Sequence, residues 1–131
     1  MDINIIKLAE CFSIDKNKYP DNIETERLLL DKSKETDCTT VLYSICLNVE
    51  EKEKIGEIVL IFDGEIWYKI NKQYRNQGYV TEALTSVLEI SHKNHYLSIE
   101  NKNKASKKVA KKLGFSKTKR IGNLCIYRKN S

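Results

Sequence analysis

The chain has 131 residues, of which 40% are hydrophobic and 31% are charged, and its formal net charge is +5. This length suits one domain with one core, and the composition fits neither a disordered chain nor a membrane-spanning one. We therefore expect a single domain, with an N-terminal helix and linker over residues 1–22 and the core over residues 24–128. No basic segment typical of a signal peptide follows Met1.

The four cysteines are scattered along the chain, without a C-x-x-C pair and without a histidine at metal-ligand spacing. They are Cys11, Cys38, Cys46 and Cys125. From this usage we expect reduced thiols, a cytoplasmic protein and no bound metal.

The first half of the chain predicts one helix followed by four strands. Ile5, Leu8 and Phe12 recur at the spacing of one helical face. Apolar runs and alternating patterns predict strands over Glu24 to Asp31, Thr40 to Asn48, Ile55 to Phe62 and Glu65 to Asn71. The last two strands are separated by Asp63 and Gly64, which favour a two-residue hairpin turn.

The second half predicts two helices and three strands. Apolar residues at helical spacing predict a helix from Val80 to about His92, and Lys104 to Leu113 predicts another. Strands are expected over Tyr96 to Glu100, Phe115 to Ile121 and Leu124 to Arg128. This order of elements predicts a single-domain α/β fold with a mixed sheet of the α+β kind.

The segment from Tyr74 to Leu84 joins the fourth predicted strand to the helix that follows, and it contains Arg75 and Gly78. The first N–H groups of a helix lack intrahelical partners and carry partial positive charge. A glycine at such a junction allows a ligand to approach the backbone closely. The segment therefore predicts a cradle for a pyrophosphate or a similar anion.

Lysine and arginine residues are crowded into the last third of the chain. Most such runs are solvated helix faces, and the alternative is a surface that binds an anionic ligand. Nucleic acid is the weaker choice of ligand, because no aromatic residues are interleaved with the lysines from Lys104 to Lys112.

Residues Arg75 to Leu84 read R-N-Q-G-Y-V-T-E-A-L and resemble motif A of the GNAT superfamily of N-acetyltransferases. The T-E-A part is similar to the RimJ/RimL-like branch, which acetylates the amino termini of ribosomal proteins. Three further segments are similar to that branch: Glu24 to Leu30, Ile55 to Ile58, and Asn101 to Phe115 with its N-x-x-S start and L-G-F end. The matches span most of the chain, and the resemblance implies a GNAT-like fold.

The resemblance also implies a reaction, in which an acetyl group passes from acetyl-coenzyme A (acetyl-CoA) to a primary amine by direct attack. The resemblance to this branch favours a protein α-amino group as the acceptor, with a lysine as the alternative, and no metal is expected. The residues implied in binding acetyl-CoA are Tyr68, Lys69, Ile70, Arg75, Asn76, Gln77, Gly78, Tyr79, Val80, Thr81 and Asn103. A surface salt bridge is the alternative for Arg75, and a helix cap is the alternative for Asn103.

Catalysis requires a neutral amine, so a carboxylate is expected to remove its proton. Glu65 on the fourth strand is the first candidate and Glu57 on the preceding strand is its competitor, although either can be an ordinary surface residue. Ser106 aligns with the serine that assists the leaving thiolate in the ribosomal-protein branch. Many other GNAT enzymes have a tyrosine that acts as the acid at the position of Ala110. Because this chain has alanine there, a tyrosine acid at that position is excluded.

Two departures from the family pattern concern the ligands. Val80 stands where motif A prefers glycine or alanine, and it adds bulk near the phosphates. The connection from Leu30 to Val41 is too short for the two helices that usually wall the acceptor site, so we expect an open cleft, covered at most by the N-terminal helix or by the second subunit of a homodimer. A rival hypothesis is a module of the same fold that binds coenzyme A or a protein without catalysis.

Overall fold

In the computed structural model of the protein, residues 12–130 are described. In chain order the elements are η1 (Lys16–Lys18), β1 (Asn22–Glu24), β2 (Leu28–Lys32), β3 (Thr40–Leu47), β4 (Lys54–Ile61), β5 (Ile66–Ile70), η2 (Lys72–Tyr74), α2 (Tyr79–Ile90), β6 (His95–Glu100), α3 (Lys104–Lys112), β7 (Ser116–Ile121) and β8 (Leu124–Lys129). The helix predicted from Ile5 lies outside the described residues, except for its last residue, Phe12. The ring of Phe12 contacts Phe62 edge-on, with 5.4 Å between ring centroids.

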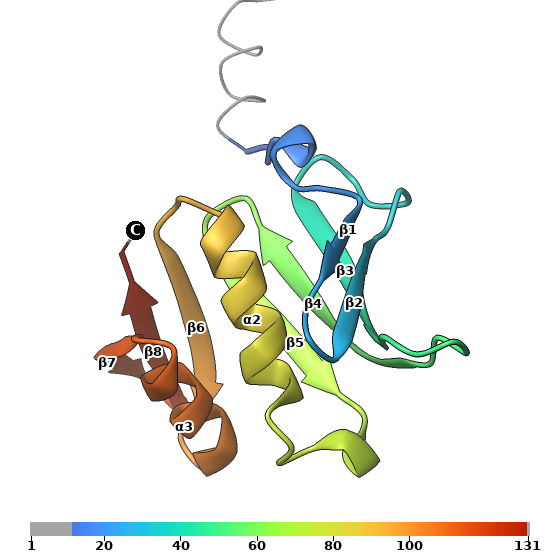
Figure 1. Ribbon diagram of the computed structural model, residues 1–131. Coiled ribbons are helices and arrows are strands. Elements are labelled where there is room, and N and C mark those ends of the chain that lie inside the picture. The colour runs from blue at the N-terminus through green and yellow to red at the C-terminus, as the bar shows by residue number, and fades with distance from the viewer. Residues whose placement is uncertain (1–11, 131) are drawn as a thin grey trace, which may run out of the picture.

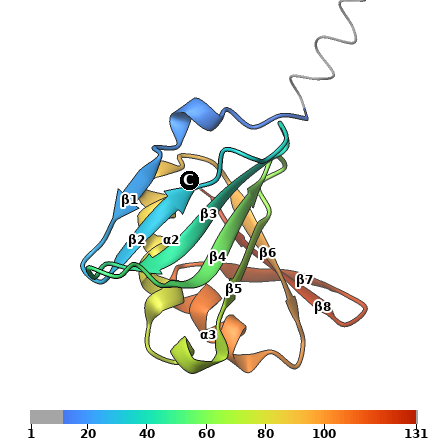
Figure 2. The same cartoon turned by 90° about the vertical axis from the view of Figure 1, so that its right-hand side faces the viewer.

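The strands form two antiparallel sheets that diverge from one another (Figure 1). The first sheet has the order β1-β2-β3-β4-β5 and the second has the order β6-β8-β7. Strands β5 and β6 lie side by side only at one end, where a single parallel bridge joins Glu65 to Tyr96. Beyond that bridge the two sheets separate, and Figure 2 shows this gap between β5 and β6 above α3. The predicted α/β (α+β) fold class is confirmed.

One face of the first sheet carries the core, because alternate strand residues point to the same side. On β3 the side chains of Val41, Tyr43 and Ile45 are buried, and the residues between them are half-buried. Helix α2 covers this face and buries Ala83 and Val87 against it. The apolar stripe of α2 is therefore matched to the alternation of the sheet, and the packing fixes where the N-terminus of the helix lies.

Two local predictions were wrong in detail. The strand predicted from Glu24 to Asp31 is a hairpin of β1 and β2, because Thr25 turns the chain: its backbone N–H donates to the carbonyl of Leu28 at 2.9 Å. The β4–β5 turn has three residues rather than two, since Ile61 pairs with Glu65 and Gly64 takes the left-handed conformation at φ 100°.

Candidate active site

The cradle predicted at the start of α2 has an unusual backbone. Both Asn76 (φ 62°) and Gly78 (φ 81°) adopt left-handed conformations, and Gly78 is the N-cap of α2. No side chain caps this helix end. The N-terminus of α2 is thus turned toward a cleft, and its backbone N–H groups can donate hydrogen bonds to an anion there.

A cluster around Glu82 holds the cradle in place. Its carboxylate accepts hydrogen bonds from the Thr25 hydroxyl at 2.5 Å, from the Arg27 backbone N–H at 2.9 Å and from Arg27 Nε at 2.7 Å. The Arg27 guanidinium also donates to the carbonyl of Gln77 and lies over the ring of Tyr79. The sequence segments E-T-E-R and T-E-A therefore meet here, and their shared task is to anchor the helix start.

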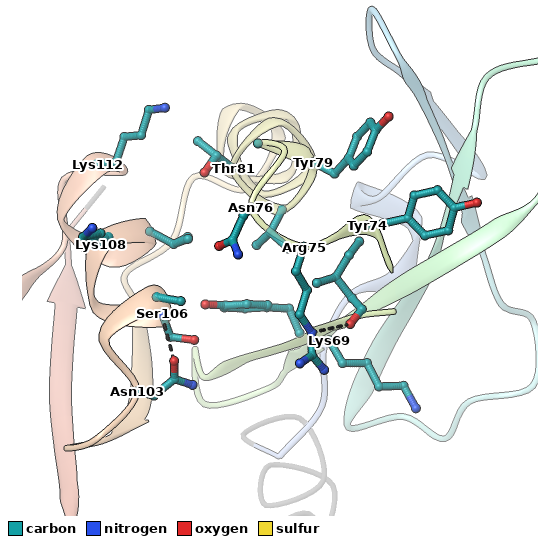
Figure 3. A pocket seen from close by; sticks show the side chains of 16 residues that line it. Lys69, Tyr74, Arg75, Asn76, Tyr79, Thr81, Asn103, Ser106, Lys108 and Lys112 are labelled. Carbon is teal, nitrogen blue, oxygen red and sulfur yellow. Dashed lines mark hydrogen bonds between the residues drawn. The ribbon is translucent and has the colours of Figure 1, made fainter. Parts of the chain in front are cut away.

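The first cleft lies between the cradle and α3 and has a volume of about 740 Å³ (Figure 3). One wall is formed by Tyr68, Lys69 and Ile70 of β5. Opposite the cradle, the other wall is formed by the start and one face of α3: Asn103, Ala105, Ser106, Lys108, Val109 and Lys112. Both lysines lie across the cleft from Asn76 and Thr81 in Figure 3, so this end of the cleft combines cationic side chains with the helix N-terminus.

A second cleft of about 390 Å³ lies between β5 and β6. Its lining is Ile66, Trp67, Tyr68, Leu97, Ser98, Ile99, Glu100, Asn103, Ser106 and Leu124. Trp67 and Leu124 are exposed. Three residues, Tyr68, Asn103 and Ser106, line both clefts, so the two clefts meet at the gap between the diverging sheets.

Of the residues implied in binding acetyl-CoA, all but Gln77 line the first cleft. The Gln77 side chain instead donates to the carbonyl of Gln73. Arg75 borders the cleft and donates from Nε to the carbonyl of Ile70 at 3.2 Å, rather than to a carboxylate. Val80 also borders the cleft, yet its side chain is 9% exposed and packs in the core, so little of its bulk faces a ligand.

Asn103 is a helix cap, the alternative that the sequence offered for it, and it also lies at the clefts. Its Oδ1 accepts a hydrogen bond from the Ser106 backbone N–H at 3.0 Å, which makes it the N-cap of α3. The residue also lines both clefts beside Ser106. The cap therefore fixes the position of Ser106 at the place where the clefts meet.

The two candidate bases lie in neither cleft lining. Glu65 accepts a hydrogen bond from the hydroxyl of Ser98 at 2.8 Å, and Ser98 lines the second cleft. Burial alone would raise the pKa of the Glu57 carboxyl, but Lys54 and Lys69 donate hydrogen bonds that outweigh it and lower the pKa. Glu57 is thus a carboxylate already paired with two cations, which makes it a weak base.

Sequence reasoning missed several lining residues. Lys108 and Lys112 were grouped with the other lysines of the last third, and only their four-residue spacing on one helix face could have singled them out. Trp67, Glu100 and Leu124 of the second cleft come from three separate strands or strand ends. No local pattern connects them, because they meet only through the divergence of β5 and β6.

Residues 11–116 match the family described as "Acetyltransferase (GNAT) domain". The chain belongs to the GNAT acetyltransferase family. The match confirms the predicted acetyl-CoA-dependent acetyltransferase and its cosubstrate at the level of the family. The first cleft of this GNAT domain fits that group, because the cradle and β5 both line it and the lysines of α3 make it cationic.

Solved structures share the fold of this GNAT domain at low identity. An acetyltransferase from Agrobacterium tumefaciens has a TM-score of 0.71 at 17% identity, covering 92% of this chain and 96% of that one. The microcin C7 self-immunity acetyltransferase MccE, solved with acetyl-CoA and AMP, has a TM-score of 0.60 at 18% identity, covering 71% and 62%. An acetyltransferase from Salmonella typhimurium, described as modifying the N-terminal serine of ribosomal protein L7/L12, has a TM-score of 0.58 at 14% identity, covering 71% and 64%.

No curated protein matches the sequence. Within residues 12–130 the GNAT domain has no helix long and apolar enough to span a membrane. The same residues contain no group of three or more His, Cys, Asp or Glu side chains that could hold a metal ion.

Proposed function

We propose that this GNAT domain transfers the acetyl group of acetyl-CoA to a primary amine of a protein, either an α-amino group or a lysine. One observation carries the proposal: the cleft beside the cradle and the cleft between β5 and β6 meet at Tyr68, Asn103 and Ser106, which line both. Such an arrangement lets a donor and an acceptor approach one another end to end, which is what direct transfer requires.

The residues of the first cleft would hold acetyl-CoA. The cradle from Arg75 to Thr81 offers backbone N–H groups for the pyrophosphate, and Lys108 and Lys112 offer charge for the remaining phosphate. Strand β5 has a free edge beyond Glu65, beside which the extended pantetheine arm would lie. The bound group supplies an activated acetyl thioester at the point where the clefts meet.

The acceptor would enter through the second cleft. No helix stands between β2 and β3 in residues 33–39, so nothing in that connection walls off a small acceptor. The exposed side chains of Trp67 and Leu124 offer apolar surface to a polypeptide, and Glu100 offers charge to a cationic amine. An acetyltransferase of a ribosomal protein has the same fold, which is compatible with a protein acceptor.

Glu65 would remove the proton of the attacking amine through Ser98, whose hydroxyl lines the second cleft and donates to the carboxylate. Ser106 would donate a hydrogen bond to the leaving thiolate, as the family resemblance implies. The whole chain would act as one domain, in the cytoplasm, where thiols stay reduced; Cys38, Cys46 and Cys125 form no disulfide. A homodimer would be compatible with the open acceptor side.

The test combines binding with turnover. Acetyl-CoA at 100 times its dissociation constant should add about 2.7 kcal/mol to the free energy of unfolding. Thiol release should then accompany acetylation of a panel of peptides with free amino termini or lysines. No stabilisation at millimolar acetyl-CoA would overturn the proposal, and binding without thiol release across the panel would favour the non-catalytic module.

The base assignment has its own test. Glu65→Gln should slow acetylation most at low pH and least as the pH approaches the pKa of the acceptor amine, roughly 8 for an α-amino group, where the neutral amine is already abundant. Ser98→Ala should give the same pH profile, since it breaks the same path. Glu57→Gln is the matched control and should leave the profile unchanged; equal effects of Glu57→Gln and Glu65→Gln would reject the assignment.

A further inference from the structure

The hydroxyl of Tyr68 is placed unlike any other polar group at the junction of the clefts. Tyr68 lies on β5 and lines both clefts, yet its oxygen is inaccessible to solvent. Within residues 12–130 it is the one buried side-chain polar atom that makes no hydrogen bond. The Ser106 hydroxyl lies near enough to lower the pKa of Tyr68 as a hydrogen-bonding neighbour, although the two side chains do not meet in strict hydrogen-bond geometry.

An unpaired buried hydroxyl is unfavourable, and proteins seldom retain one without a use. Burial raises the pKa of Tyr68 above its ordinary value, and the neighbouring Ser106 offsets part of that rise. The hydroxyl therefore keeps its proton at neutral pH and has that proton available to donate. Position 110 of α3 is a fully buried alanine that lines neither cleft, so no tyrosine reaches the junction from there.

We propose that the Tyr68 hydroxyl donates a hydrogen bond to the sulfur that leaves acetyl-CoA, acting from β5 opposite Ser106 of α3. The inference rests on the proposed acetyl transfer. The amine nitrogen bonds to the acetyl carbon, the carbon–sulfur bond breaks, and its electron pair stays on sulfur. The amine gives one proton to the base, solvent finally protonates the thiolate, and Tyr68 keeps its own proton throughout.

The location of the breaking bond follows from the two clefts. If acetyl-CoA fills the first cleft and the amine enters the second, the acetyl group is transferred beside the three residues that line both clefts. The Asn103 oxygen is already occupied by the cap of α3. The Tyr68 and Ser106 hydroxyls remain there as donors, and a donor held in place stabilises developing charge.

The first test measures binding rather than turnover. A donor to sulfur stabilises bound coenzyme A as its thiolate, so the affinity for coenzyme A should rise as the pH approaches about 8.5, the ordinary pKa of a thiol. In Tyr68→Phe the affinity for coenzyme A at that pH should fall roughly tenfold, because a hydrogen bond to a charged group is lost. Affinity for acetyl-CoA, which has no thiol, should change less than about twofold.

Other charged groups also lie around the junction. They are Lys69 on β5, Arg75 in the cradle, Lys108 and Lys112 on α3, and Glu100 at the end of β6. All are present in both the parent and the variant, so their effects cancel in the comparison. Calorimetric titration over pH 6.5 to 9 would give the affinities of both ligands.

The second test separates a catalytic from a structural hydroxyl. Tyr68→Phe should lower kcat roughly 100-fold with little change in KM for acetyl-CoA. It should leave Tm unchanged or raise it, because the deleted hydroxyl has no partner in the free protein. Tyr43→Phe is the matched control: Tyr43 is buried, lines neither cleft and donates to the Pro20 carbonyl, so Tm should fall while coenzyme A binding keeps its pH dependence.

An unchanged kcat in Tyr68→Phe, or equal losses of affinity for acetyl-CoA and coenzyme A, would overturn the role of Tyr68. Those results leave the proposed function intact, because the parent protein still binds and acetylates. Failure of the parent protein to bind acetyl-CoA would instead overturn the proposed function itself.

Discussion

At the scale of single residues, the lysines of α3 differ in what they face. Lys108 and Lys112 line the first cleft, whereas Lys111, between them on the same helix, does not. The sequence could show the excess of charge in this region, but a solvated face and a binding face have the same composition. Only the helix phase relative to the cradle separates the two kinds of lysine.

This difference predicts a selective loss of affinity. Lys112→Ala should weaken acetyl-CoA binding roughly tenfold, because one charge-assisted contact to phosphate is lost. The loss should shrink as salt concentration rises, since exposed charges are screened. Lys111→Ala removes an equal charge from the same helix and should leave the dissociation constant within about twofold; equal losses from both would point to a general field instead of a contact.

At the scale of elements, the active site depends on how α2 begins. Gly78 and Asn76 turn the chain, and Glu82 ties the first turn of α2 to the β1–β2 hairpin through Thr25 and Arg27. A Cβ at Gly78 would lie 3.4 Å from Arg27 Nη2, so the cradle is also closely packed from behind. The helix start is thus held from the sheet side, and its N–H groups are left for a ligand.

Removing the anchor should therefore affect both stability and binding. We expect Glu82→Ala to lower the free energy of unfolding by about 2 kcal/mol, because charged hydrogen bonds to Thr25 and Arg27 are lost. Acetyl-CoA binding should weaken as well, since the cradle is less well ordered. Urea unfolding and calorimetric titration would measure the two effects.

Glu89→Ala is the control for that experiment, because Glu89 is an exposed residue near the other end of the same helix. It should change stability by less than about 0.5 kcal/mol and leave binding unchanged. A Glu82→Ala protein with normal affinity for acetyl-CoA would contradict the role given to the anchor.

At the scale of the whole molecule, a buried chain of hydrogen bonds connects segments from both sheets. Tyr19 contacts Ser91 at 2.9 Å, Ser91 contacts His95 Nε2 at 2.7 Å, and His95 Nδ1 donates to the carbonyl of Gly64 at 2.9 Å. Because the Gly64 carbonyl can only accept, the proton of the neutral imidazole is on Nδ1 and Nε2 accepts from Ser91. This chain of hydrogen bonds joins the segments at the end of the molecule where β5 and β6 are still adjacent.

Because His95 belongs to this buried chain of hydrogen bonds, we expect the stability of the protein to depend on pH. Burial lowers the pKa of His95 below its ordinary 6.5, although the bond to Gly64 opposes the shift. Below pH 6.5 the unfolded chain therefore takes up a proton that the folded protein resists, and the free energy of unfolding should fall, by up to about 1 kcal/mol at pH 5.5. Urea unfolding at pH 7.5, 6.5 and 5.5 would measure the change.

Substitution separates the two histidines of the chain. His95→Gln should be less stable at pH 7.5 and should lose most of the decline between pH 6.5 and 5.5. His92 is exposed, and His92→Gln should keep the decline of the parent protein. A decline that survives in His95→Gln would assign it to other groups.

Much of this architecture could be predicted from local sequence. The strands from Thr40 onward and both helices after the cradle lie within one or two residues of their predicted positions. The β1–β2 hairpin was missed because Thr25 makes its turn without glycine or proline, through hydrogen bonds to Leu28 that leave no compositional mark. The lining residues of the two clefts that the sequence did not reveal were missed for a similar reason, since they are adjacent only in space.

The sequence by itself determined the family and predicted the cradle at the start of α2, because both depend on short segments with fixed spacing around Gly78 and Asn103. The tertiary structure alone decided where the two clefts meet, which lysines of α3 line the first cleft and which tyrosine lies at the junction. These features arise from the divergence of β5 and β6 and from the phase of α3 against β5. Such relations are set by packing between distant segments, which no local pattern of residues encodes.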